Sequence, residues 1–148
     1  MLKIRVGVLE QHDIACFGLC EHLSRQPALY LVGAYDTFDS TLQALQQQRL
    51  DVLMIGHLID DNPRQLVRIL SRRHPGLKVL VLLDYPDPQL ASTLQSLGAQ
   101  GVMSKTQPLP DYVDVLQSLA RGEHYAVGND HPGSDPQAML QSLLESAL

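Results

Sequence analysis

DVLMIGHLI, residues 51–59, is the stretch that decides the fold. Its four consecutive apolar residues, 52–55, are bounded by polar ones, which is typical of a strand buried on both faces. The strand ends at Gly56 and His57. In open α/β sheets, ligands and chemistry lie at the carboxyl ends of the strands. Position 56 therefore lies where a site is expected, but glycine provides no acid, base or nucleophile there.

On both sides of this stretch, strand and helix patterns alternate along the chain. Apolar runs and alternation predict strands at residues 3–9, 29–35, 52–55, 78–83 and 101–104. Helical spacing predicts helices at about 14–25, 39–49, 63–74, 88–98 and 110–122. Crossover helices of this kind force parallel strands with helices on both faces. We predict an α/β fold, a (βα)5 doubly wound domain whose parallel five-stranded sheet has the flavodoxin-like order 2-1-3-4-5.

Several residues have the chemistry of helix ends. Thr37 or Asp39 provides a cap for the second helix. The pairs Asn62-Pro63 and Asp87-Pro88 combine a capping side chain with a proline suited to the first turn. Gly98 is expected to close the fourth helix.

Composition excludes several classes of protein. The 148 residues are 45% hydrophobic, enough for an ordinary core, and no apolar run is long enough to span a membrane. The N-terminus has no signal-peptide pattern, so we expect a cytoplasmic protein. A formal net charge of −5 argues against a chain that itself grips nucleic acid. Two cysteines cannot build a disulfide framework.

The composition changes after residue 126. Residues 127–135 are rich in Gly, Pro and Asp, which indicates a linker between a domain at 1–126 and a C-terminal segment. That segment, residues 136–148, is predicted to form a short amphipathic helix, too short to be stable alone in water.

Several stretches resemble the receiver domains of bacterial response regulators, especially the NarL/LuxR class. They are IRVGVLEQHDIACFGLCEHL, LVGAYDTFDSTLQAL, RLDVLMIGHLI, RHPGLKVLVLLDY and SLGAQGVMSKTQPLPDYVDVLQSLARGEHYA. The resemblance covers residues 3–126 in order. It implies a domain that accepts a phosphoryl group on an aspartate, with magnesium held by two acids and with a hydroxyl and a lysine on the phosphoryl oxygens.

The matching positions form a degenerate phosphoacceptor pocket: Glu10, Gln11, Gly56, Leu83 and Lys105. One acid of the metal pair is an amide, the acceptor is glycine, the hydroxyl position is leucine and the aromatic switch position is Val102; only the lysine matches. We therefore predict no phosphoryl transfer, no catalytic residue, no cofactor and no metal. The lysine then needs another anion, so we predict an ion pair between Glu10 and Lys105.

Two alternatives remain for these strand ends. Glu10, His57, Asp60, Asp61 and Lys105 could form a rebuilt pocket that binds a metal or small ligand, although a solvated loop is the simpler interpretation of the three loop residues. Asp84 follows the fourth strand and could replace the missing acceptor, although its strand-end geometry differs from that of position 56.

The first helix carries apolar residues on more than one side. Its expected core face is Ile14, Gly18, Leu19, His22 and Leu23. Off that face lies a possible interface with another subunit, which Tyr112 of the fifth helix could join: Cys16, Phe17, Cys20 and Tyr112. His12, Cys16 and Cys20 also repeat every four residues, but as metal ligands they would need a second chain to close the site.

We expect a phosphorylation-independent receiver domain that acts as a homodimer or with a partner protein in signalling or transcriptional regulation. By resemblance, DNA would be contacted only through a C-terminal module, and the ending SDPQAMLQSLLESAL does not resemble the opening of one. The alternative is a flavodoxin-like protein that binds a small ligand or metal.

Overall fold

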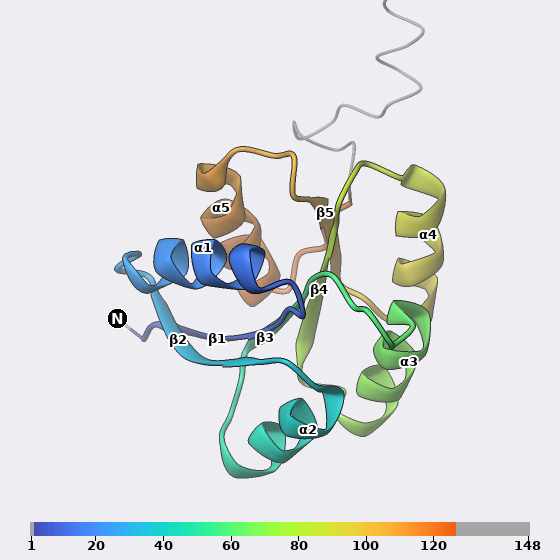
Figure 1. The fold of residues 1–148 in the computed structure, drawn as a ribbon, viewed down its shortest axis with the longest axis horizontal. Coiled ribbons are helices and arrows are strands. Elements are labelled where there is room, and N and C mark those ends of the chain that lie inside the picture. Colours follow the sequence, from blue (N-terminus) through green and yellow to red (C-terminus); the bar gives the residue numbers. More distant parts are fainter. Residues whose placement is uncertain (1, 127–148) are drawn as a thin grey trace, which may run out of the picture.

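The computed structural model describes residues 2–126. Its five strands are β1 (Ile4–Leu9), β2 (Leu29–Tyr35), β3 (Val52–Ile55), β4 (Lys78–Leu83) and β5 (Gly101–Ser104). Its helices are α1 (Asp13–Ser24), α2 (Phe38–Gln47), α3 (Pro63–Arg73), α4 (Pro88–Leu97) and α5 (Leu109–Ala120). All strand pairs are parallel and the sheet order is β2-β1-β3-β4-β5, which confirms the predicted fold (Figure 1).

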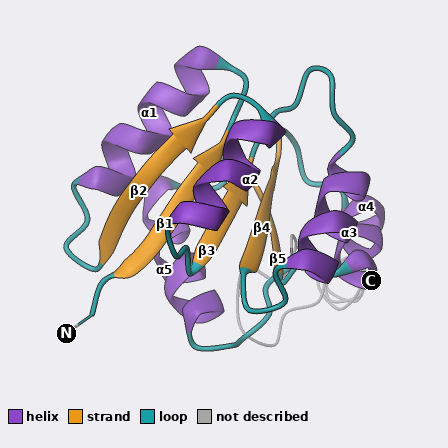
Figure 2. Cartoon of the chain, turned by 90° about the horizontal axis from the view of Figure 1, so that it is seen from below, coloured by secondary structure: helices purple, strands orange, loops and turns teal. Residues whose placement is uncertain are grey.

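The sheet lies between two helical layers (Figure 2). α1 and α5 cover one face, while α2, α3 and α4 cover the other. β3 contributes to both cores, because Val52 and Met54 pack toward α1 and α5 and Leu53 and Ile55 pack toward the opposite layer. The stretch that predicted the fold is thus the centre of the sheet, and its carboxyl end is enclosed by neighbouring strands.

The predicted caps lie at helix N-termini. The side chains of Thr37, Asn62 and Asp87 accept hydrogen bonds from the first-turn amides of α2, α3 and α4 respectively. Gly98 ends α4 with φ of 122°, a conformation that favours glycine. The three N-caps therefore mark where the loops that follow β2, β3 and β4 end.

The predicted core face of α1 is wrong in part. Leu19 and Leu23 are buried, but Ile14 is 79% exposed and Gly18 faces open space. The helix carries apolar residues on several of its sides, so their spacing alone could not show which side packs on the sheet. His22 is half-buried, and its ring nitrogen lies 3.1 Å from the carbonyl oxygen of Leu109 at the start of α5.

The suggestion that Tyr112 could join an interface with Cys16, Phe17 and Cys20 is also wrong. Tyr112 is only 5% exposed and packs from α5 into the core that α1 also covers. Burial raises the pKa of its phenol above the ordinary value. Tyr112 therefore contributes to the stability of the domain and not to its surface.

Two further predictions concern membrane-spanning segments and the C-terminal part of the chain. Within residues 2–126 no helix combines the length and apolarity that crossing a bilayer requires. The predicted linker, 127–135, and the predicted C-terminal helix, 136–148, lie outside the described residues.

Candidate functional site

Glu10 is the central residue at the carboxyl ends of the strands. It directly follows β1 and is 2% exposed. One carboxylate oxygen, Oε1, forms an ion pair with Nζ of Lys105, which follows β5. The other, Oε2, accepts a hydrogen bond from the backbone amide of His12 at 3.0 Å. The ion pair predicted from the sequence is present, and both oxygens of this buried carboxylate have partners.

Gly56 lies against this carboxylate. Its amide donates to the carbonyl of Leu9 at 2.8 Å, which draws the ends of β3 and β1 together. A Cβ atom built on Gly56 would lie 2.8 Å from Cδ of Glu10 and closer still to Oε1. The carboxylate of Glu10 therefore fills the space that any side chain at position 56 would need.

Gln11 joins three strand-end loops. Its side-chain amide donates to the carbonyl of Asp36 after β2 at 3.0 Å, and its Oε1 accepts from the amide of Ile59 after β3. Its backbone amide donates to the carbonyl of His57 at 3.0 Å. The side-chain oxygen that would be the natural ligand for a hard cation is thus already used within the protein.

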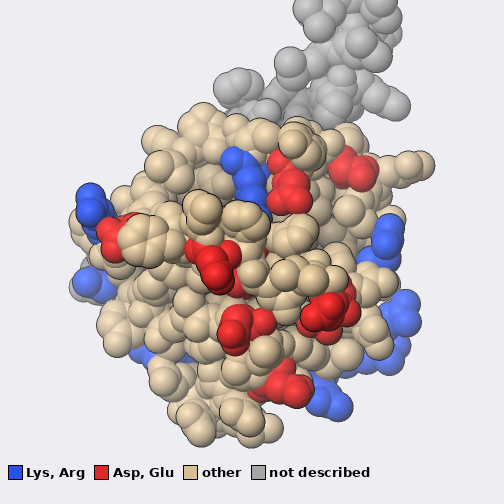
Figure 3. All heavy atoms as spheres, in the orientation of Figure 1, with Lys and Arg blue, Asp and Glu red and all other residues tan. Residues whose placement is uncertain are grey.

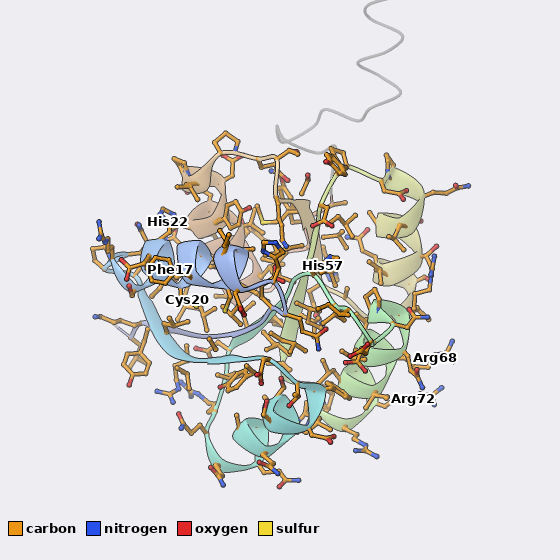
Figure 4. The ribbon with its side chains drawn as sticks, in the orientation of Figure 1. Phe17, Cys20, His22, His57, Arg68 and Arg72 are labelled. Atoms are coloured by element: carbon orange, nitrogen blue, oxygen red, sulfur yellow. The ribbon has the colours of Figure 1, made fainter. Side chains whose placement is uncertain are left out.

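Lys105 connects Glu10 to more exposed groups. Its Nζ lies 3.5 Å from Oδ1 of Asp84, whose Oδ2 lies 3.4 Å from Nδ1 of His57. The side chain of Asp84 is 52% exposed, so the Asp84 end of this ion-pair network is solvated. Figure 4 shows His57 among the loops at the centre of this face. The contact between Asp84 and Lys105 was not predicted from the sequence.

The rebuilt metal site does not assemble. Asp60 and Asp61 make no ion pair or side-chain hydrogen bond with this network among the described residues. Across residues 2–126, no three His, Cys, Asp or Glu side chains come close enough to hold a metal ion. Leu83 and Val102 are buried in the core, where they offer the site no polar atom.

A groove of about 380 Å³ opens beside Gly56. It lies between the loop that follows β3 and the loop that follows β4. Its polar lining comes from His57, Asp84 and Asp87, and Tyr85 adds an aromatic ring that is 75% exposed. The groove is therefore acidic and aromatic at its β4 side, and no lysine or arginine of the described residues lines it.

The residues considered as metal ligands on α1 have other roles. His12 is the N-cap of α1, and its Nδ1 accepts from the amide of Ala15 at 3.3 Å. The Sγ atoms of Cys16 and Cys20 lie 4.0 Å apart and both thiols are free. Burial, followed by the neighbouring Cys16, raises the pKa of the Cys20 thiol to about 11. The sequence prediction missed this capping role, because the helix was expected to begin at residue 14 and histidine is not among the usual N-cap residues.

The fold class follows from the sheet and the helices that cover it. A parallel sheet in order 2-1-3-4-5 between α1/α5 and α2/α3/α4 is the flavodoxin-like fold, and Lys105 reaching a carboxylate at the strand ends agrees with the resemblance to receiver domains of bacterial response regulators. No protein-family model matches the chain.

Individual relatives agree with this class. The chain is 26% identical over 123 residues to the response regulator GacA of Pseudomonas viridiflava, an alignment that spans 82% of this chain and 58% of GacA. The receiver domain of the stress response regulator RcsB from Escherichia coli has a TM-score of 0.77 at 21% identity, covering 84% of this chain and 98% of that one. A LuxR-family response regulator from Aurantimonas sp. SI85-9A1 has a TM-score of 0.78 at 14% identity, covering 84% and 89%.

The chain is thus a homologue of response regulators and folds as their receiver domain does. It spans little more than half the length of the curated relatives it matches.

Proposed function

We propose that the chain is a phosphorylation-independent receiver domain, which signals by protein contact and not by accepting a phosphoryl group. The observation that carries the proposal is the position of Glu10. The acceptor position is Gly56, and the carboxylate of Glu10 occupies the space beside it while paired with Lys105. Phosphoryl transfer needs a nucleophile, and none is present on β3 at this point.

The metal-binding part of the site supports the same proposal. A magnesium ion needs several free oxygen ligands in near-octahedral geometry. Glu10 already binds Lys105 and the amide of His12, and Gln11 already binds the loops after β2 and β3. Releasing either side chain would break contacts that hold the strand-end loops together. We accordingly propose neither a metal ion nor an enzymatic activity for this pocket.

The surface through which the domain would act is the outer side of α1. Phe17 is 70% exposed there and Ile14 is 79% exposed, while Cys16 and Cys20 are half-buried beside them. Exposed apolar residues that adjoin one another on a helix favour a protein contact. We propose that a second copy or a partner protein covers this side, in the cytoplasm, in signalling or transcriptional regulation.

DNA binding is proposed only for a separate C-terminal module. In one related structure, two RcsB dimers are bound to two parallel DNAs. The described part of the present chain corresponds to the receiver region, and the net charge of −5 of the full chain does not favour DNA binding.

Incubation with acetyl phosphate and magnesium, followed by intact-mass measurement, tests the proposal. We expect no phosphoryl adduct under conditions that label a receiver domain with an intact acceptor aspartate. The Asp84→Asn variant is the matched control for the substitute acceptor. A stable adduct on the wild-type chain would overturn the proposal, and its loss in Asp84→Asn would assign the acceptor to Asp84.

A second candidate function is the binding of a small ligand. It is favoured by the groove of about 380 Å³ that opens onto Gly56, His57 and Asp84. A thermal-shift screen with metals and nucleotides tests this function, since a ligand that binds the folded state raises the midpoint of unfolding. A shift that disappears in Asp84→Asn would place the ligand in this groove.

A further inference from the structure

A row of arginines runs along the exposed side of α3. Arg64, Arg68 and Arg72 follow one another at intervals of four residues, and Arg73 adjoins the last. Four residues of helix rise about 6 Å, so the three lie on successive turns of one side. All four are exposed, and none forms an ion pair within residues 2–126. Figure 4 shows Arg68 and Arg72 projecting away from the body of the domain.

The opposite side of α3 explains why the row is fixed in place. Leu66, Val67 and Leu70 are buried in the core, with Leu70 fully enclosed. The arginines therefore cannot turn inward to find partners without unfolding the helix. Any protein that binds them would approach this face from outside.

Acidic residues gather on the face formed by the loops that follow the strands. Figure 3 shows them over the centre of that face, with lysine and arginine mostly at its rim. The exposed acids include one or two from each of the loops after β2, β3 and β4: Asp36, Asp60, Asp84 and Asp87. Lys105 lies on this face, where it is paired with Glu10 and lies 3.5 Å from Asp84. Asp87 makes no ion pair within residues 2–126.

The groove beside Gly56 is lined by side chains whose chemistry suits an arginine. Asp84 and Asp87 line it, and Tyr85 presents an exposed ring at its edge. A guanidinium group binds carboxylates through a planar fork of donors and stacks on aromatic rings, so both features suit arginine better than lysine. Pro63 at the start of α3 also lines the groove, so Arg68 and Arg72 of the same chain lie further along the helix, beyond it.

Charge decides what occupies this groove. A nucleic acid would be attracted by the arginine row but repelled by a chain with a net charge of −5 and an acidic strand-end face. A second copy of the chain presents both complementary surfaces. We propose that Arg68 and Arg72 of one copy dock into the groove between the β3–α3 and β4–α4 loops of the next, so that copies associate head to tail.

This contact joins two different surfaces. In a pair of copies, one copy keeps a free groove and the other keeps a free arginine row. Such heterologous contacts therefore continue into rings or open chains of copies. It is therefore distinct from a symmetric contact through α1, and it does not depend on whether the domain accepts a phosphoryl group.

Sedimentation velocity over a range of concentrations tests the proposal with the full chain. We expect self-association at low ionic strength that weakens at least about tenfold in about 1 M salt, where the screening length falls to about 3 Å. Arg68→Glu/Arg72→Glu should abolish this salt-sensitive association. Lys3→Glu/Arg25→Glu changes the net charge equally on another surface and should leave it intact, as should Phe17→Glu.

A mixing experiment separates head-to-tail docking from other modes. Tyr85→Lys places a positive charge in the groove and leaves the arginine row unchanged. Both defective variants carry Phe17→Glu as well, which removes contact through α1. Each should then be monomeric alone, whereas a mixture should form one-to-one pairs and nothing larger, because only one intact row can meet one intact groove. A monomeric wild-type chain, association unaffected by Arg68→Glu/Arg72→Glu, or a mixture that stays monomeric would each overturn the proposal. Labelling by acetyl phosphate would leave it standing, since that outcome bears only on the pocket.

Discussion

The carboxylate of Glu10 and the absent side chain of Gly56 share one space at the end of the sheet. A Cβ atom on Gly56 would come within 2.8 Å of Glu10 Cδ, and that carboxylate is held by Lys105 and by the amide of His12. The site thus keeps a carboxylate, but it comes from the end of β1 and not from β3. The negative charge of Glu10 is paired within the protein, so Lys105 needs no external anion as its partner.

Gly56→Ala should therefore destabilise the domain. The added methyl group must displace a buried, ion-paired carboxylate, an overpacking that costs about 1–3 kcal/mol. Gly76→Ala is the matched control, because a Cβ there meets no atom within 4 Å. Urea unfolding measures both free energies, and the control should stay within about 0.5 kcal/mol of wild type. Equal effects of the two substitutions would contradict the close approach of Glu10 to position 56.

Glu10→Gln should be more costly. Removing one charge of a buried pair costs about 3–5 kcal/mol, and we expect the lower end, because Asp84 remains 3.5 Å from Lys105 and the lysine side chain is 21% exposed. Glu10→Gln/Lys105→Met removes both charges and should recover most of the lost stability. Glu123→Gln breaks an exposed pair with Arg121 and should have no measurable effect. A double variant as unstable as Glu10→Gln alone would argue against the pair as the cause.

Gln11→Asp should not restore a magnesium site. The aspartate would supply the second acid of the family pattern, but it would lose the amide that donates to the carbonyl of Asp36 and shorten the reach to Ile59. We expect lower stability and no increase in the unfolding temperature on adding magnesium, measured by thermal shift. Calcium and sodium at matched ionic strength control for general salt effects. A shift specific to magnesium would show that the loops can release this side chain.

Most of the fold could be predicted from sequence because its signals are local. The apolar run 52–55, the caps Asn62 and Asp87 and the glycine at 98 each act within a few residues, and all appear in the structure as expected. The Glu10–Lys105 pair was also predictable, since the two residues end strands that meet at the same edge of the sheet.

The rest depends on packing that no local pattern encodes. The approach of Glu10 to Gly56 depends on the distance between the carboxyl ends of β1 and β3. The hydrogen bonds of Gln11 to other loops depend on the paths of the loops after β1, β2 and β3. The prediction for α1 failed for another reason: apolar residues on several sides gave more than one acceptable core face, and Ile14 was assigned to the wrong one.

Phe17 and Tyr112 should respond in opposite ways to truncation. Phe17 is 70% exposed, so Phe17→Ala should change the free energy of unfolding by no more than about 0.5 kcal/mol. Tyr112 is 5% exposed, and Tyr112→Ala should cost about 3–5 kcal/mol through the cavity it leaves. Measured by size-exclusion chromatography with light scattering in the Arg68→Glu/Arg72→Glu background, where head-to-tail docking is absent, contact through α1 should weaken in Phe17→Ala while the domain stays folded. Unchanged association would remove Phe17 from the proposed contact surface.

Cys20 should alkylate slowly in the folded protein. Its pKa is raised to about 11, chiefly by burial and then by Cys16, so its thiolate fraction near neutral pH is about 100-fold below that of an ordinary thiol. Iodoacetamide labelling at pH 8, followed by peptide mass mapping, should show this retardation, and the rate should rise as the pH approaches 11. Cys16→Ser should restore part of the reactivity and not all of it, because burial is the larger cause. Labelling in urea provides the unfolded reference, and equal rates in urea and in buffer would show that the thiol is not shielded.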